Sequence, residues 1–129
     1  MNRGQAAVEL AVVLIVLLLL IIGGFELARF ITLKHSLSAG TWHAARYLSL
    51  NPWDEEKARE IILQTVERNV LGSSKDVEIY IYFEDPLNKK FGSRFSILAE
   101  IPFDPFIPFL PITPRKISVS HSLMVEAWP

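Results

Sequence analysis

Hydrophobic residues are concentrated in one continuous run near the start of the chain. Residues 6–25 carry a single charged side chain, Glu9, and residues 10–25 are apolar apart from two glycines. Twenty residues in a helix would be about 30 Å long, the thickness of a bilayer's hydrocarbon core. A helix is expected because lipid offers no partner for exposed backbone N–H and C=O groups. The pattern predicts a membrane-spanning helix over residues 6–25.

The residues that flank this run favour an N-terminus inside the cell. Arg3 and the N-terminal amine precede the run, and basic residues stay on the cytoplasmic side. A cleaved secretory signal is the competing interpretation, with residues 1–3 as its basic region. The run is longer than the roughly 7–15 residues of a signal's apolar region, and no clear cleavage motif follows it. We therefore expect a single-pass anchor in the cytoplasmic (inner) membrane, with the C-terminal domain extracytoplasmic.

Beyond the apolar run, hydrophobic residues recur at every third or fourth position up to residue 50. This spacing is typical of a helix with one buried face. The stripe consists of Leu27, Phe30, Leu33, Leu37, Thr41, Ala44 and Leu48. The pattern predicts one long helix over residues 5–50, with Gly40 as a candidate kink.

The remaining segment, residues 51–129, has the pattern of a small α+β domain. A second helix is predicted over residues 52–71, with Asn51 as its N-cap, Pro52 in its first turn and Gly72 as its stop. Three segments with alternating apolar residues follow, at 76–84, 93–101 and 115–126. Each has one apolar face that the helices can cover. The predicted fold class is α+β: a long N-terminal helix, a second helix and a three-stranded antiparallel sheet, as in pilins.

A proline-rich segment separates the last two predicted strands. Proline occurs at every third position from Pro102 to Pro114, which is the period of a polyproline II helix. Each of the first four prolines is followed by a large apolar residue: Phe103, Phe106, Phe109 and Ile112. This row either packs on the domain's own sheet or helix, or forms an exposed apolar interaction strip for the next subunit or the bilayer surface.

Composition narrows the range of functions. The chain has 129 residues, a net charge of −1 and no cysteine. These values exclude a disulfide framework and give no reason to expect a nucleic-acid partner. There is no nucleophile elbow, phosphate-binding loop or HExxH motif, and Lys89 and Lys90 are predicted to be solvated in a turn. We expect no catalytic residue, no metal and no cofactor, and so a protein that is not an enzyme.

Glu9 is the unusual residue of the apolar run. A carboxylate at the bilayer centre costs up to ~3 kcal/mol, although the cost is lower near the end of a span. Glu9 ends the string Gly-Gln-Ala-Ala-Val-Glu, which begins at Gly4 and follows Arg3. This string resembles the N-terminus of the type IV pilin superfamily, and within it the TadE-like pseudopilins of tight-adherence (Flp) pilus systems. Residues 44–47, Ala-Ala-Arg-Tyr, are similar to a patch that TadE-like proteins carry at this place.

The resemblance implies a processing site and a set of partners. A prepilin peptidase would cut between Gly4 and Gln5, removing residues 1–4 as a leader. Glu9, then the fifth mature residue, would pair with the free amine of a neighbouring subunit and set the axial register of assembly. The implied partners are other pilin-like subunits, the major Flp pilin, the inner-membrane pilus assembly platform and the lipid bilayer.

The length of the domain after the first helix distinguishes a minor pilin from a major one. Major Flp pilins have little beyond the first helix, so the residues after position 50 favour a minor pilin-like subunit that takes part in assembly of a tight-adherence type IV pilus. The alternative is an unprocessed single-pass binding module of an envelope complex.

Overall fold

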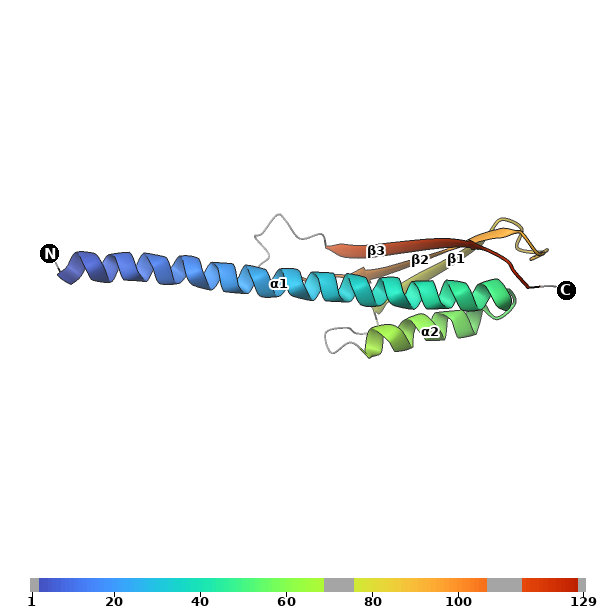
Figure 1. The fold of residues 1–129 in the computed structure, drawn as a ribbon, viewed down its shortest axis with the longest axis horizontal. Helices are drawn as coiled ribbons and strands as arrows, with labels where there is room; N and C mark the ends of the chain where they lie inside the picture. Colours follow the sequence, from blue (N-terminus) through green and yellow to red (C-terminus); the bar gives the residue numbers. More distant parts are fainter. Residues whose placement is uncertain (1–2, 69–75, 107–114, 128–129) are drawn as a thin grey trace.

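The longest element of the structure is a helix whose N-terminal part projects alone and whose C-terminal part belongs to an α+β domain. The structure, a computed structural model, describes residues 3–68, 76–106 and 115–127. Its elements in chain order are α1 (Arg3–Leu50), α2 (Glu55–Glu67), β1 (Glu78–Phe83), β2 (Arg94–Pro102) and β3 (Lys116–Met124). Figure 1 shows the N-terminal part of α1 extending beyond everything else, while its C-terminal part lies alongside α2 and the sheet. The predicted α+β class, with two helices and a three-stranded antiparallel sheet, is confirmed.

The N-terminal part of α1 makes no apolar core with the rest of the described chain. Its large apolar side chains between Val8 and Ile22 are 40–68% exposed. The helix is long and apolar enough to cross a membrane. Val, Leu and Ile side chains that cover all sides of a helix are stable only where other apolar groups surround them. Lipid or the apolar helix of another subunit meets that requirement.

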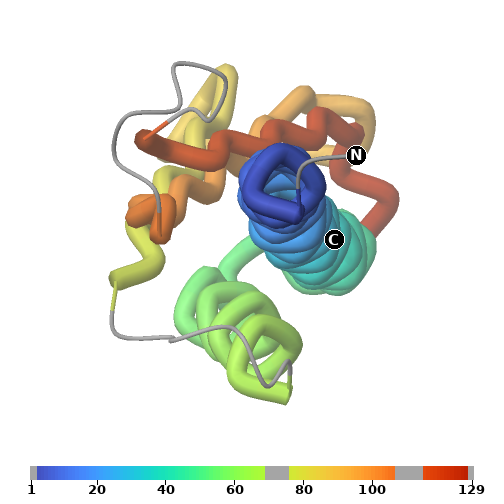
Figure 2. The backbone as a smooth tube through the Cα atoms, turned by 90° about the vertical axis from the view of Figure 1, so that its left-hand side faces the viewer, coloured from blue at the N-terminus to red at the C-terminus, as the bar shows by residue number. Residues whose placement is uncertain are grey.

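The sheet is built around its central strand. Its order is β1-β2-β3, and both neighbouring pairs are antiparallel. The buried residues of β2 alternate along the strand and are Phe95, Ile97, Ala99 and Ile101. These are the residues that the period-two pattern places on the apolar face. Viewed along α1, the two helices lie side by side, with the strands to one side of the pair (Figure 2).

The core joins both helices to the apolar face of the sheet. From α1 it takes Leu33, Leu37, Ala44 and Leu48, and from α2 it takes Ala58, Ile62 and Val66. The predicted stripe on α1 is thus largely the buried face. Its first residue is an exception: Leu27 is 57% exposed, and the neighbouring Glu26 is buried instead. A carboxylate takes the buried position because its hydrogen-bond partners come from a distant part of the chain, as described below.

The second helix begins later than the sequence suggests. Asp54, not Asn51, is its N-cap, and the Asp54 side chain accepts a hydrogen bond from the Lys57 amide at 3.2 Å. The Tyr47 hydroxyl donates to the other oxygen of Asp54 at 2.6 Å. The Asn51 amide still bonds to the Tyr47 carbonyl, so Asn51 completes the last turn of α1. Two side-chain bonds to Asp54 therefore fix the cap three residues beyond the predicted one.

The proline-rich segment begins as a strand. Pro102 is the last residue of β2 and lies opposite Lys116 of β3, and the Phe103 amide donates to the Arg115 carbonyl at 2.8 Å. Sheet pairing therefore overrides the polyproline period at its first proline. A proline is tolerated at a strand end, where its missing N–H interrupts no central ladder. Residues 103–106 follow the strand and are described below, whereas residues 107–114 of the predicted period lie outside the described residues.

Gly40 is the point of closest approach between the two helices. Helix α1 runs through this position without interruption. A Cβ atom here would lie 3.1 Å from Cβ of Thr65 and 3.3 Å from the backbone Cα and O of Ile62. All three distances are shorter than ordinary van der Waals contacts. The absence of a side chain at Gly40 thus lets α2 pack directly on the backbone of α1.

A larger residue at this crossing is expected to destabilise the domain. Gly40→Leu should lower the free energy of unfolding by about 1–3 kcal/mol, because the added side chain overpacks the interface. Gly24→Leu is the control, since no atom lies within 4 Å of its added Cβ and both changes gain helix propensity. Denaturant unfolding in detergent, followed by tryptophan fluorescence, measures the difference. Equal midpoints for the two variants would contradict this account of the crossing.

Candidate functional site

The predicted processing site lies at the free end of α1. Gly4, Gln5 and Glu9 are all exposed and lie on the part of the helix that projects away from the domain. Within the described part of the chain, Glu9 forms no ion pair or side-chain hydrogen bond. Glu9 lies four residues after Gln5, so the two side chains share one helix face. The arrangement leaves both the candidate cleavage site and the carboxylate accessible to other molecules.

Gly4 is not required by the packing of the chain. A Cβ atom added to it would have no heavy atom within 4 Å. It lies in the first turn of α1, at the end of the helix farthest from the domain. Gly40 shows the opposite situation, since a Cβ there would make tight contacts of 3.1–3.3 Å with α2. The fold explains the glycine at position 40 and does not explain the one at position 4.

A second polar site joins α1 to the segment after β2, just beyond the apolar run. Glu26 is only 2% exposed, and its carboxylate accepts a hydrogen bond from the Phe106 amide at 3.3 Å. Its other oxygen lies 3.5 Å from the Arg29 guanidinium. The buried carboxylate is thus paired with a cation and with a backbone donor, as a buried charge must be.

Arg29 completes this junction. Its guanidinium donates to the Asp104 carbonyl at 2.8 Å and lies 4.7 Å from the ring centre of Phe103 and 4.6 Å from that of Phe106. Both distances are within the range of cation–π attraction. Arg29 and Glu26 together fix residues 103–106 against the helix; we call this set the junction clamp. Local sequence patterns do not predict this clamp, because the partners lie 75 to 80 residues apart in the chain.

The predicted apolar row is divided by the clamp. Phe103 is 1% exposed and packs in the core, with its ring 5.4 Å from that of Phe30 in an edge-on arrangement. Phe106 is 65% exposed. Phe109 and Ile112 lie outside the described residues. Where the structure describes the row, then, one ring packs on the chain's own helix and the next faces outward.

The segment at residues 44–47 ties the end of α1 to two other elements. Ala44 and Ala45 are fully buried in the core. The Arg46 guanidinium contacts both carboxylate oxygens of Glu126 at 3.0 Å, and Tyr47 contacts Asp54. The pKa of Asp54 is lowered, chiefly by the Tyr47 hydroxyl and then by the Lys57 amide. The four residues thus hold the start of α2 and the chain after β3 in place.

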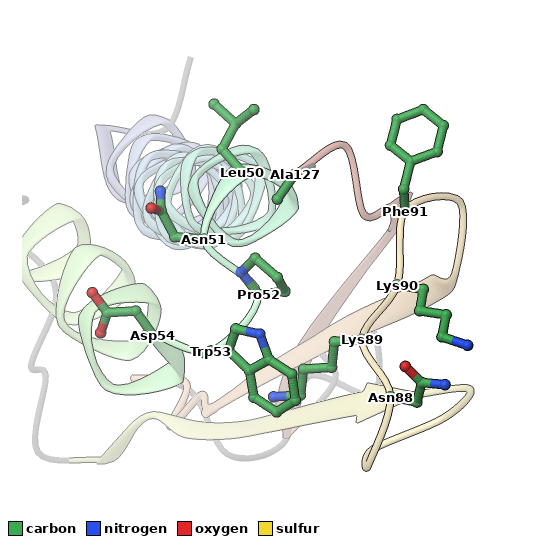
Figure 3. Close-up of a pocket in the computed structure, with 10 residues that line it drawn as sticks. All are labelled: Leu50, Asn51, Pro52, Trp53, Asp54, Asn88, Lys89, Lys90, Phe91 and Ala127. Atoms are coloured by element: carbon green, nitrogen blue, oxygen red, sulfur yellow. The ribbon is translucent and has the colours of Figure 1, made fainter. Parts of the chain in front are cut away.

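A hollow of about 1040 Å³ opens at the opposite end of the domain from the junction clamp. Residues 50–54, residues 88–91 and Ala127 line it (Figure 3). The side chain of Lys89 is only 6% exposed, which corrects the prediction that it is solvated. It forms an ion pair with Glu55 at 2.6 Å and lies 4.0 Å from the ring centre of Phe83. Its donor and charge are therefore used within the fold.

The described residues offer no obvious centre for catalysis. No group of three or more His, Asp or Glu side chains among them is placed to hold a metal ion. The carboxylates described above are engaged in caps, ion pairs or the clamp, apart from the exposed Glu9.

Fold and helix together define a class: an α+β domain carried on a long apolar N-terminal helix of the kind that can anchor a protein in a membrane. Residues 4–46 match the family described as TadE-like protein. The match covers about a third of the chain and includes Gly4, Glu9 and the junction clamp's two helix residues. Over this segment the chain is similar to TadE-like proteins, and the resemblance inferred from the sequence is confirmed. No curated protein and no solved structure matches the chain.

Two arginines of α1 allow the clamp's contribution to be measured. Arg29→Met should lower the free energy of unfolding by roughly 1–3 kcal/mol, because it leaves the buried Glu26 carboxylate without its cation. Arg46→Met is the matched control, since its ion pair is about half exposed and such pairs contribute only about 0–1 kcal/mol. Thermal unfolding in detergent measures both. A smaller loss for Arg29→Met than for Arg46→Met would show that the clamp is not a stabilising contact.

Proposed function

We propose that this protein is a minor pilin-like subunit that is cut by a prepilin peptidase after Gly4 and takes part in assembly of a tight-adherence (Flp) pilus. It helps to initiate or cap the filament, in contact with other pilin-like subunits, the major Flp pilin and the inner-membrane assembly platform. The TadE-like match over residues 4–46 is the observation that carries this proposal. It covers the helix on which both the cleavage site and the assembly carboxylate would lie.

The position of Gly4 supports processing. The glycine lies at the free end of α1 with open space around it, so a protease can approach the Gly4–Gln5 bond without disturbing the domain. A residue without a Cβ also allows the backbone to leave the helix and become extended in an active site. Packing gives no reason for a glycine here, and recognition by a protease would give one.

The position of Glu9 supports assembly. Cleavage would create a cationic amine on Gln5, one helical turn before the Glu9 carboxylate. In lipid, the carboxylate of one subunit and the amine of the next stabilise each other, whereas either charge alone is unfavourable. The exposed apolar surface of α1 then packs against neighbouring helices. The charge pair would set the axial register, which is the offset between neighbouring subunits along the filament.

The membrane topology follows from the same elements. The N-terminus lies in the cytoplasm, α1 crosses the inner membrane over residues 6–25, and the α+β domain is extracytoplasmic. The basic residue before the apolar run supports this orientation.

The cleavage proposal is tested by the N-terminus of the protein from its native membrane. In cells with an active prepilin peptidase the mature chain should begin at Gln5. Gly4→Leu should retain Met1, because a bulky side chain blocks the approach of the protease, whereas Gly24→Leu should be cut normally. Intact-mass measurement and N-terminal sequencing distinguish the products. Retention of Met1 in the unaltered protein contradicts the proposal, and a start beyond residue 25 would indicate a cleaved signal.

The role of Glu9 is tested separately from insertion. Glu9→Ala should remain in the membrane fraction but lose association with its pilus partners by tenfold or more, if the charge pair contributes ~1.4 kcal/mol or more. Glu56→Ala, which removes an exposed carboxylate in the domain, should associate normally. Crosslinking in native membranes and a count of pili report the effect. Unchanged complex formation by Glu9→Ala would favour the alternative, an unprocessed membrane-anchored binding module.

A further inference from the structure

The junction clamp holds one aromatic ring outward at the end of the apolar helix. Phe106 is 65% exposed, and its ring centre lies 6.2 Å from that of Phe25, the last residue of the apolar run. Phe25 is itself 56% exposed, and Leu27 is 57% exposed. Phe25 and Phe106 lie against each other, whereas Leu27, two residues further along α1, faces a different side of the helix. We call these three residues the rim, since they expose apolar side chains around α1 where the helix meets the domain, and an apolar partner surface would stabilise them.

The described residues that follow β2 are held against α1 at two points. The Asp104 carbonyl is bound by Arg29, and the Phe106 amide is bound by Glu26. The guanidinium lies against both phenylalanine rings, so it separates the buried Phe103 from the exposed Phe106. The bonds therefore determine which ring points inward and which points outward. The exposure of Phe106 therefore follows from these contacts.

The level of the rim along α1 identifies its partner. The apolar run ends at Phe25, and Glu26 and Arg29 are the first charged residues after it. The rim therefore lies where the hydrocarbon of the bilayer gives way to the headgroups. Aromatic side chains are enriched at this level of membrane proteins, where they contact both regions. A second copy of the chain would not need the rim to coincide with the end of the apolar run.

We propose that Phe106, with Phe25 and Leu27, seats the domain on the bilayer surface, and that the junction clamp holds Phe106 at the height of the lipid headgroups. The occupant of this surface is the lipid interface itself. The inference rests on the membrane anchorage contained in the proposed function, but not on cleavage or pilus assembly. The clamp also keeps Glu26 and Arg29 paired with each other and with the backbone at a level where water is scarce.

The chain contains no cysteine, so single positions can be labelled cleanly. We would place an environment-sensitive fluorophore at Phe106→Cys, Leu18→Cys or Phe91→Cys in the full chain, reconstituted in phosphatidylcholine–phosphatidylglycerol nanodiscs. Leu18 lies in the apolar run, and Phe91 is a phenylalanine of similar exposure, 54%, at the far end of the domain. Nitroxide groups near the lipid headgroup or deep in the acyl chain report depth, and iodide reports contact with water.

Each position has a distinct expected result. The label at 106 should show blue-shifted emission and be quenched by the shallow nitroxide but little by iodide. The label at 91 should be quenched by iodide alone, and the label at 18 by the deep nitroxide. Adding Glu26→Gln should weaken the clamp, so that shallow quenching at 106 decreases and iodide quenching increases. The label at 18 should be unaffected by this change.

Three outcomes would overturn the proposal, and they are distinguishable. If the label at 106 behaves like that at 91 while 18 is deeply quenched, the domain does not touch the bilayer. If 106 is shielded from iodide only at high protein-to-lipid ratios, another copy of the chain covers the rim. If the label at 18 shows no lipid quenching, membrane anchorage itself fails, and the proposed function fails with it. Circular dichroism of each variant establishes that the fold is retained.

Discussion

An α-helix satisfies its own backbone hydrogen bonds. For this reason α1 can continue without a break from an apolar segment that projects alone into a segment that packs in the domain. Over its first part the side chains are apolar on all sides, as an apolar surrounding requires. From Leu33 onward only one stripe is buried, against α2 and the sheet. The change from all-round to one-sided burial takes place on a single continuous rod. The domain's orientation about the helix axis is therefore set by the stripe.

Charged side chains need partners most where the apolar run of α1 ends and the domain begins. Charged groups are needed to mark the end of an apolar span, but an unpaired charge beside lipid is costly. The chain meets both requirements with Glu26 and Arg29, which pair with each other and with the backbone of residues 104–106. The same bonds carry the chain from β2 back onto the helix. One small cluster thus satisfies the charges and positions a loop.

Sequence reasoning succeeded where the determining interactions are local. The alternation along β2 fixes which side chains face the core, and the stripe from Leu33 to Leu48 follows from helical spacing alone. It failed where the partner is remote. Burial of Glu26 depends on the Phe106 amide and burial of Lys89 on Glu55, and the cap of α2 moved to Asp54 because of Tyr47. Pro102 joined the sheet because β3 lies beside it. No periodicity within one segment encodes these pairings.

Helix α1 carries two carboxylates, Glu9 within the apolar run and Glu26 directly after it. The structure separates the role of one from that of the other. Glu26 is buried and its partners lie within the chain, so its presence is explained by the fold. Glu9 is exposed, and in the described residues it has no such partner, although it lies within the apolar run. If that run enters lipid, the charge of Glu9 is stabilised either by water at the edge of the span or by a group from another molecule. The proposed cleavage after Gly4 would provide such a group, because it frees the amine of a neighbouring subunit. One proposal therefore accounts for both the candidate cleavage site and Glu9.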